Sequence, residues 1–140
     1  MTLIDTGPLV ALTDKGDKEM HEKCVSIVKQ LSGSLTTTLP CLTEAMHFLR
    51  GLRGWKGQDG LWQYVKNGEL LIHLPLQSEL IRASELMEQY QDTPMAIADA
   101  SLVALAELSG VHQIITSDSD FYHYRINGKD SFEVILLSAP

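Results

Sequence analysis

Short apolar segments alternate with amphipathic helical segments along this chain, and that alternation limits the possible folds more than any other feature. Each apolar or β-branched segment has the length and composition of a buried strand. These predicted strands cover residues 1–4, 35–38, 70–74, 113–116 and 132–137. Strands separated by helices form βαβ units with right-handed crossovers. We therefore predict an α/β fold, a three-layer α/β/α sandwich with a mostly parallel central sheet of four to five strands.

The predicted helices lie between these strands, where apolar residues recur at a spacing of three to four. They cover a short segment after Leu9 and the stripes at 17–31, 40–49, 80–90 and 97–108. Pro40 suits the first position of its helix, and Thr93-Pro94 has the pattern of an N-cap followed by a first helical residue. We therefore expect the helix that contains Asp99 to begin at Thr93-Pro94 and to end at Gly110.

Length and composition indicate an ordinary globular protein. A chain of 140 residues with 44% hydrophobic residues fits one domain, so we predict a single domain over 1–140. The start lacks a basic signal-peptide region, and the sequence has no apolar run of about 18 residues, so we expect a cytoplasmic protein without membrane segments. Cys24 and Cys41 lack CxxC spacing and are expected to be reduced core thiols. A net charge of −7 argues against a passive nucleic-acid coat protein, but not against a nuclease with grouped carboxylates.

Four acidic residues occupy positions that an α/β fold brings to one edge of its sheet. Asp5 and Asp118 fall at the ends of predicted strands, while Glu44 and Asp99 lie in the opening turns of predicted helices. Because ligands of parallel sheets bind beyond the carboxyl ends of the strands, we expect these four side chains on one rim. Each acid also has an ordinary local interpretation: a turn for Asp5 and Asp118, a solvated first turn for Glu44, and a helix N-terminus for Asp99.

Grouped carboxylates repel one another in a partly desolvated cleft unless a cation offsets their charge. Hard oxygen ligands without Cys or His suit Mg²⁺ or Mn²⁺, which activate water and stabilise the leaving oxygen in phosphodiester hydrolysis. Asp99 is the most informative of the four, because it is the lone carboxylate in the apolar segment 95–100. These four acids therefore predict metal-dependent phosphoryl chemistry.

Other classes of enzyme match the motifs less well. Asp5-Thr6-Gly7 spells the motif of aspartic proteases, but that all-β class does not fit the helical stripes, and no second copy of the motif follows. A phosphatase with an aspartyl nucleophile normally carries a second Asp two residues later, where this chain has Gly7. The pattern Glu44-x-x-His47 of di-iron helical bundles occurs only once and in an α/β context.

Four stretches taken together resemble the acidic motifs of PIN-domain ribonucleases, in particular the small VapC-like toxins. They are LIDTGPLVAL at 3–12, Pro-x-x-x-Glu-Ala at 40–45, PMAIADA at 94–100 and IITSDSDF at 114–121. The resemblance implies that Asp5, Glu44, Asp99 and Asp118 bind Mg²⁺ or Mn²⁺ and cleave single-stranded RNA. It also implies that Thr6 and Thr116 flank this site, that Asp120 is a more variable acid beside it, and that the chain forms a homodimer. A toxin would have an antitoxin protein as its partner.

The segment after Glu44 has no counterpart in these motifs. It combines three cations with an aromatic side chain, namely Arg50, Arg53, Trp55 and Lys56. One interpretation is an RNA contact, in which cations hold phosphate and the indole stacks on a base. The other is a flexible connection whose tryptophans seal the core or a partner interface. A non-catalytic RNA- or protein-binding module with this fold is the alternative to the nuclease.

Overall fold

A five-stranded, fully parallel sheet forms the centre of the protein in a computed structural model that describes residues 1–138. The strand order is β3-β2-β1-β4-β7. The strands are β1 (Thr2–Ile4), β2 (Leu35–Thr38), β3 (Leu70–His73), β4 (Gln113–Thr116) and β7 (Glu133–Leu136). All five predicted strands are therefore confirmed, and the sheet is entirely rather than mostly parallel.

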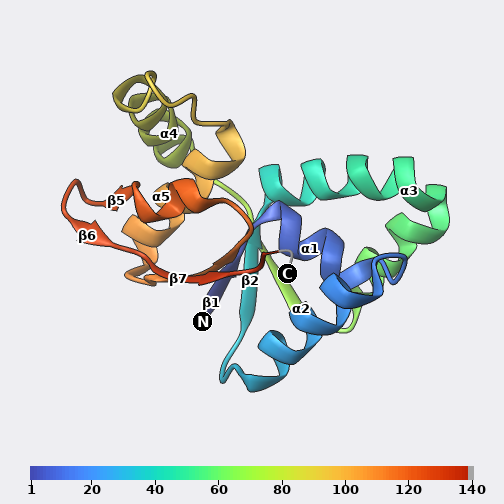
Figure 1. Cartoon of the computed structure of the whole chain (residues 1–140). Coiled ribbons are helices and arrows are strands. Elements are labelled where there is room, and N and C mark those ends of the chain that lie inside the picture. Colours follow the sequence, from blue (N-terminus) through green and yellow to red (C-terminus); the bar gives the residue numbers. More distant parts are fainter. Residues whose placement is uncertain (139–140) are drawn as a thin grey trace.

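The helices lie on both sides of this sheet (Figure 1). They are α1 (Thr6–Thr13), α2 (Lys18–Gln30), α3 (Leu39–Lys66), α4 (Gln77–Gln89) and α5 (Ile97–Ser109). The chain moves from β1 to β2 and β3 in one direction, and then returns past β1 to reach β4 and β7. Crossovers of one hand put their helices on opposite faces when the direction reverses, so α1, α2 and α3 cover one face, and α4 and α5 cover the other. This confirms the predicted three-layer arrangement.

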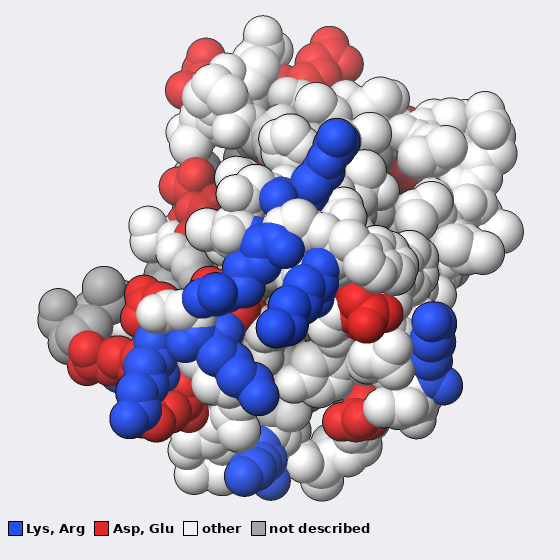
Figure 2. Space-filling model, turned by 90° about the vertical axis from the view of Figure 1, so that its right-hand side faces the viewer, with Lys and Arg blue, Asp and Glu red and all other residues white. Residues whose placement is uncertain are grey.

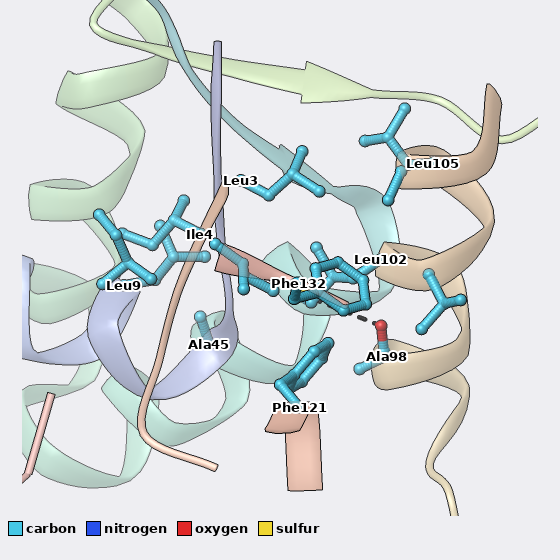
Figure 3. Close-up of a cluster of buried hydrophobic side chains, with 14 of the residues drawn as sticks. Leu3, Ile4, Leu9, Ala45, Ala98, Leu102, Leu105, Phe121 and Phe132 are labelled. Carbon is cyan, nitrogen blue, oxygen red and sulfur yellow. Dashed lines mark hydrogen bonds between the residues drawn. The ribbon is translucent and has the colours of Figure 1, made fainter. Parts of the chain in front are cut away.

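The core between the sheet and α5 also anchors the loop that follows β4. Figure 3 shows Phe121 and Phe132 beside Leu102 of α5. Phe121 is fully buried, and its ring meets that of Phe132 edge to face at 5.4 Å. Such a packed aromatic pair adds stability beyond its buried area. Because Phe121 follows Asp118 by only three residues, burying this ring fixes the position of the acidic loop.

The predicted start of α5 at Thr93-Pro94 is wrong. The helix begins at Ile97, after an extended Ala96 with ψ 156°. The backbone N–H of Thr93 instead bonds to the carbonyl of Tyr90 and continues the turn that ends α4. The Asp99 carboxylate accepts a hydrogen bond from the Ala96 N–H at 3.3 Å. An acid in the first turn of the helix therefore caps the N-terminus of that helix.

The segment after Glu44 is helical, so its interpretation as a flexible connection is wrong. It belongs to α3, which bends at Arg53 and Gly54. Gly54 has φ +59° and ψ −145°, a conformation that residues with a side chain rarely adopt. Trp55 beyond the bend is 65% exposed and Trp62 is 36% exposed, so neither indole seals the core.

A small hairpin lies between the acidic loop after β4 and the last strand of the sheet. It pairs β5 (Arg125–Ile126) antiparallel with β6 (Asp130–Ser131) and follows the 3-10 helix η1 (Ser119–Tyr122), and the sequence analysis missed it. Its Asn127 has φ 54°, typical of the Asn-Gly hairpin turn that the sequence contains. Cys24 and Cys41 are buried free thiols, as expected. Within residues 1–138, no helix is long and apolar enough to cross a membrane.

Candidate active site

The four predicted acids line one cleft, at the carboxyl edge of the sheet between β1 and β4. The chain reverses its direction across the sheet at this point, which is where parallel α/β sheets bind their ligands. The cleft has a volume of about 1170 Å³. Its lining includes Asp5 after β1, Glu44 on α3, Asp99 on α5 and Asp118 after β4. Four distant segments of the chain thus supply one carboxylate each.

Asp5 is the most deeply set of these carboxylates, with only 6% of its surface exposed. Its Oδ1 accepts the Thr6 N–H at 2.7 Å, which caps α1, and its Oδ2 accepts the Thr116 hydroxyl at 2.8 Å. The same Thr116 oxygen accepts the Asp118 N–H at 3.0 Å. Thr116 therefore connects the two acids at the ends of β1 and β4 and fixes their relative orientation.

Asp99 and Asp118 also combine a local role with a position in the cleft. Asp118 Oδ1 accepts the Asp120 N–H at 2.8 Å and caps the 3-10 helix η1, as Asp99 Oδ2 caps the start of α5. The remaining oxygens, Asp99 Oδ1 and Asp118 Oδ2, accept no hydrogen bond from residues 1–138. The local interpretations and the shared-site interpretation are thus compatible, because each cap uses one oxygen and leaves the other for a ligand.

Burial and mutual repulsion hold protons on this site more tightly than usual. Burial and, after it, the charges of Asp5, Asp118 and Glu44 raise the pKa of Asp99 to about 7, against the opposing hydrogen bond from Ala96. Burial likewise raises the pKa of Asp5, although the bonds from Thr116 and Thr6 oppose the shift. The charges that face each other here are therefore incompletely compensated by the protein itself, and a cation in the cleft would relieve that repulsion.

The chemistry of the donors fits a hard divalent cation. The four acids offer only carboxylate oxygens, and the buried Thr6 hydroxyl beside them has no hydrogen-bond partner among residues 1–138. Among residues 1–138, no three His, Cys, Asp or Glu side chains are close enough together to form a metal site by themselves. Mg²⁺ does not need such a cage, because it keeps several waters and is commonly held by one or two carboxylates. The residues present therefore fit Mg²⁺ or Mn²⁺ with water completing its shell.

The cleft contains side chains that the sequence analysis did not identify. His47, Phe48 and Leu52 of α3 line it next to Glu44, and Ser117 and Ser119 line it next to Asp118. Helical spacing from Glu44 is the signal that would have indicated His47 and Phe48. Ser117 lies opposite the first turn of α1: a Cβ atom on Gly7 would lie 2.9 Å from its Oγ and 3.2 Å from its Cβ, so this close approach favours glycine.

The residues predicted to contact RNA do not all lie at the cleft. Arg50 lines it. Arg53 instead binds Asp14 at the end of α1, with Nε 2.7 Å from Oδ1. Trp55 and Lys56 follow the bend of α3 and are exposed outside the cleft lining. Asp120 also lies outside the lining, and its backbone N–H donates a hydrogen bond to Asp118 Oδ1.

Comparisons with known proteins agree with this arrangement. The family profile described as PIN domain matches residues 2–127. No curated protein matches the sequence. The fold is similar to that of Mycobacterium tuberculosis VapC20, described as a Sarcin-Ricin loop cleaving toxin, with a TM-score of 0.74, 15% identity, and 81% of this chain and 87% of that one covered.

A second solved structure has the same fold. A chain of a toxin–antitoxin complex from Klebsiella pneumoniae has a TM-score of 0.64 and 19% identity, with 86% of this chain and 90% of that one covered. At such identities the likeness of structure shows the fold alone, whereas the profile match extends over nearly the whole sequence. This chain therefore belongs to the PIN domain family.

Proposed function

We propose that the protein is a divalent-metal-dependent endoribonuclease that hydrolyses phosphodiester bonds of single-stranded RNA. The observation that carries the proposal is the convergence of Asp5, Glu44, Asp99 and Asp118 on one cleft. Membership of the PIN domain family supports it. The four carboxylates offer hard oxygen ligands, which suit a divalent cation such as Mg²⁺ or Mn²⁺.

The roles of the residues follow from their positions. Asp5, Asp99 and Asp118 would hold the ion, directly or through its bound waters, with Glu44 completing the site from α3. A bound divalent ion would supply an acidified attacking water and a charge that stabilises the leaving oxygen. Thr116 keeps Asp5 oriented through its 2.8 Å hydrogen bond, and the buried Thr6 hydroxyl offers a further oxygen beside it. Asp120 acts from outside the cleft by holding Asp118 through its backbone N–H.

RNA would approach over α3, which combines cations with exposed aromatic side chains. Figure 2 shows Lys and Arg side chains gathered in a band on the face that is on the right in Figure 1. Arg50 brings one positive charge into the cleft, and Phe48 beside it is 51% exposed. Arg53, Trp55 and Lys56 would extend this contact beyond the bend, with cations on phosphates and an indole on a base.

The chain would act as the toxin of a toxin–antitoxin pair, with a protein antitoxin as its partner. The descriptions of the two solved relatives support this part of the proposal. It would form a homodimer: Leu76, Leu80 and Ile81 at α4 are 58%, 41% and 53% exposed, and exposed apolar surface of this kind marks contacts between proteins. Light scattering of the purified protein tests the dimer directly.

The test of the nuclease is cleavage of single-stranded and hairpin RNA in Mg²⁺, Mn²⁺ or EDTA, followed on gels. We expect shortening of the single-stranded RNA in either metal and none in EDTA. RNA that is retained by the protein but uncut in all three conditions would contradict the proposal and favour a non-catalytic binding module. Cleavage that persists in EDTA would contradict the role of the metal.

A further inference from the structure

Beneath the carboxylates, buried hydroxyl groups connect the first turn of α3 to the first turn of α5. The Cys41 N–H donates to Thr38 Oγ1 at 3.4 Å, and Thr38 Oγ1 lies 2.7 Å from Ser101 Oγ. The Ser101 hydroxyl donates to the carbonyl of Ala98 at 2.6 Å. Thr38 is 1% exposed, Cys41 0% and Ser101 8%, so solvent does not replace these bonds.

The donor and the acceptor of each hydrogen bond between these buried hydroxyl groups can be assigned. The Ala98 carbonyl only accepts, so the single hydroxyl hydrogen of Ser101 is committed to it. In the bond between Thr38 and Ser101, the donor must then be Thr38. Thr38 Oγ1 retains a lone pair for the Cys41 N–H. Each hydroxyl donates once and accepts once, and a fully satisfied buried network of this kind is rigid.

The Cys41 thiol connects this chain to Asp5. Its Sγ lies 3.8 Å from Asp5 Oδ1 and 3.7 Å from the Ala98 carbonyl. A carbonyl oxygen has two lone pairs, so the Ala98 carbonyl can accept both the Ser101 hydroxyl and the thiol, and the single thiol hydrogen has two acceptors within reach. A thiol in apolar surroundings stays protonated at neutral pH and can donate to either. The first turn of α3 thus contacts both the Asp5 carboxylate and the start of α5 through Cys41.

These helix starts carry like charges toward each other. Asp99 lies two residues before Ser101, and Glu44 lies three residues after Cys41. Asp99 and Glu44 line the same cleft as Asp5 and Asp118, and like charges gathered in one partly desolvated cleft repel one another. A buried tie between the two helix starts resists that repulsion in the absence of a cation.

We propose that Thr38, Cys41 and Ser101 are positioning residues, whose hydrogen-bond chain holds α3 and α5 against Asp5 so that Glu44 and Asp99 face the same cation-binding cleft as Asp5. This inference rests on the proposed function, because the cation belongs to it. It adds three residues outside the lining of the cleft, none of which is a specified position of the sequence motifs.

The test measures Mn²⁺ binding by titration calorimetry, together with cleavage kinetics. Ser101→Ala and Thr38→Val remove a hydroxyl each, and we expect Mn²⁺ affinity to fall about 10-fold, in the range for residues that orient metal ligands. The metal concentration for half-maximal cleavage should rise equally, while KM for RNA stays unchanged. Thr38→Ser and Cys41→Ser keep a donor and should bind Mn²⁺ more tightly than Thr38→Val and Cys41→Ala.

Two matched variants control for loss of a hydroxyl from the same helices. Ser109→Ala removes a hydroxyl that donates to the Leu105 carbonyl at the far end of α5. Thr43→Val removes one that donates to the Leu39 carbonyl on the exposed side of α3. Both should bind Mn²⁺ with wild-type affinity.

Circular dichroism and thermal unfolding establish that each variant is folded before its affinity is compared. Wild-type Mn²⁺ affinity in folded Ser101→Ala and Thr38→Val would overturn the inference and leave the proposed function intact. If these two variants do not fold, equal affinity in Cys41→Ala and Cys41→Ser overturns it instead. A wild-type protein that binds no Mn²⁺ and cuts no RNA would overturn both proposals.

Discussion

The cleft has a floor and a wall that are built differently. The floor is formed by Asp5, Asp99 and Asp118, and each of these carboxylates accepts a backbone N–H at 2.7 Å, 3.3 Å and 2.8 Å, respectively. The wall is the side of α3 that carries Glu44, His47, Phe48, Arg50 and Leu52.

The wall side chains are largely free of such bonds. Phe48 and Leu52 are 51% and 58% exposed, and their helix would form without them. We expect the floor, whose side chains are held by the fold and repel one another, to determine the chemistry together with Glu44. The other side chains of the wall can change at little cost in stability, and we expect them to determine what binds. Variants of the floor and of the wall test this division of roles.

The largest effect is expected for Asp99→Asn. The amide keeps the shape of the side chain and removes one charge from a site where burial and three neighbouring carboxylates oppose ionisation. Cleavage should fall about 10³-fold or more, while the melting temperature of the metal-free protein should stay the same or rise. Initial cleavage rates and thermal unfolding in EDTA measure the two quantities.

The control for that variant is Asp92→Asn, which changes an exposed acid before the same helix and outside the cleft lining. It should retain wild-type cleavage. Asp99→Asn with full activity would show that the floor is not catalytic.

A smaller effect is expected for Thr116→Val, which removes the hydroxyl between Asp5 and Asp118. Both acids keep their charge but lose their common orientation. Mn²⁺ affinity should fall about 10- to 100-fold, and unfolding free energy should fall by about 1–3 kcal/mol because a buried donor and acceptor lose their partner. Calorimetry measures the Mn²⁺ affinity and urea unfolding measures the free energy of unfolding. Thr116→Ser should restore both quantities. If Thr116→Ser binds Mn²⁺ as weakly as Thr116→Val, loss of the hydroxyl is not the cause.

The pH dependence of stability tests the repulsion on the floor directly. The pKa of Asp99 is raised to about 7 in the folded protein from the ordinary 3.8, so the folded state binds this proton more tightly than the unfolded state. Its contribution to stability is therefore full below pH 3.8 and is lost as the pH rises through 7.

We expect wild-type stability to fall relative to Asp99→Asn by about 1–2 kcal/mol between pH 4.5 and 7.5, after allowing for the solvent screening of this partly exposed group. Urea unfolding of both proteins in EDTA measures the difference, and saturating Mn²⁺ should remove it. A difference that does not change with pH would mean that the carboxylates do not repel.

The smallest effect is expected on the wall. Arg50→Ala should raise KM for single-stranded RNA about 3- to 10-fold with kcat unchanged. The slope of log binding constant against log salt concentration should become shallower by about 0.7, because one phosphate contact is lost. Lys129→Ala removes an exposed cation from the β5–β6 hairpin and is the matched control. A fall in kcat for Arg50→Ala at unchanged KM would break the division between floor and wall.

Much of this architecture follows from the sequence. Alternation of apolar strands with amphipathic stripes predicted the parallel sheet, and the position of an acid directly after each of two strands, Asp5 and Asp118, brought both to one edge. These inferences succeed because strand ends in a parallel sheet meet wherever the strands pair. The predicted start of α5 was three to four residues too early, because Thr93-Pro94 has a good local capping pattern. Asp99, which caps the actual start of the helix, was an equally local signal, and the sequence does not show which of the two is used.

The sequence by itself determined the fold class and the placement of the four carboxylates at one edge of the sheet, because both depend on periodicity and on the order of the elements along the chain. Tertiary structure alone decided the bend at Gly54, the bond from Thr116 to Asp5 across 111 positions of sequence, and the contact between Thr38 and Ser101 across 63. Hydroxyl groups carry no periodic signal, and a buried one is satisfied only by whatever neighbour packing brings within about 3 Å.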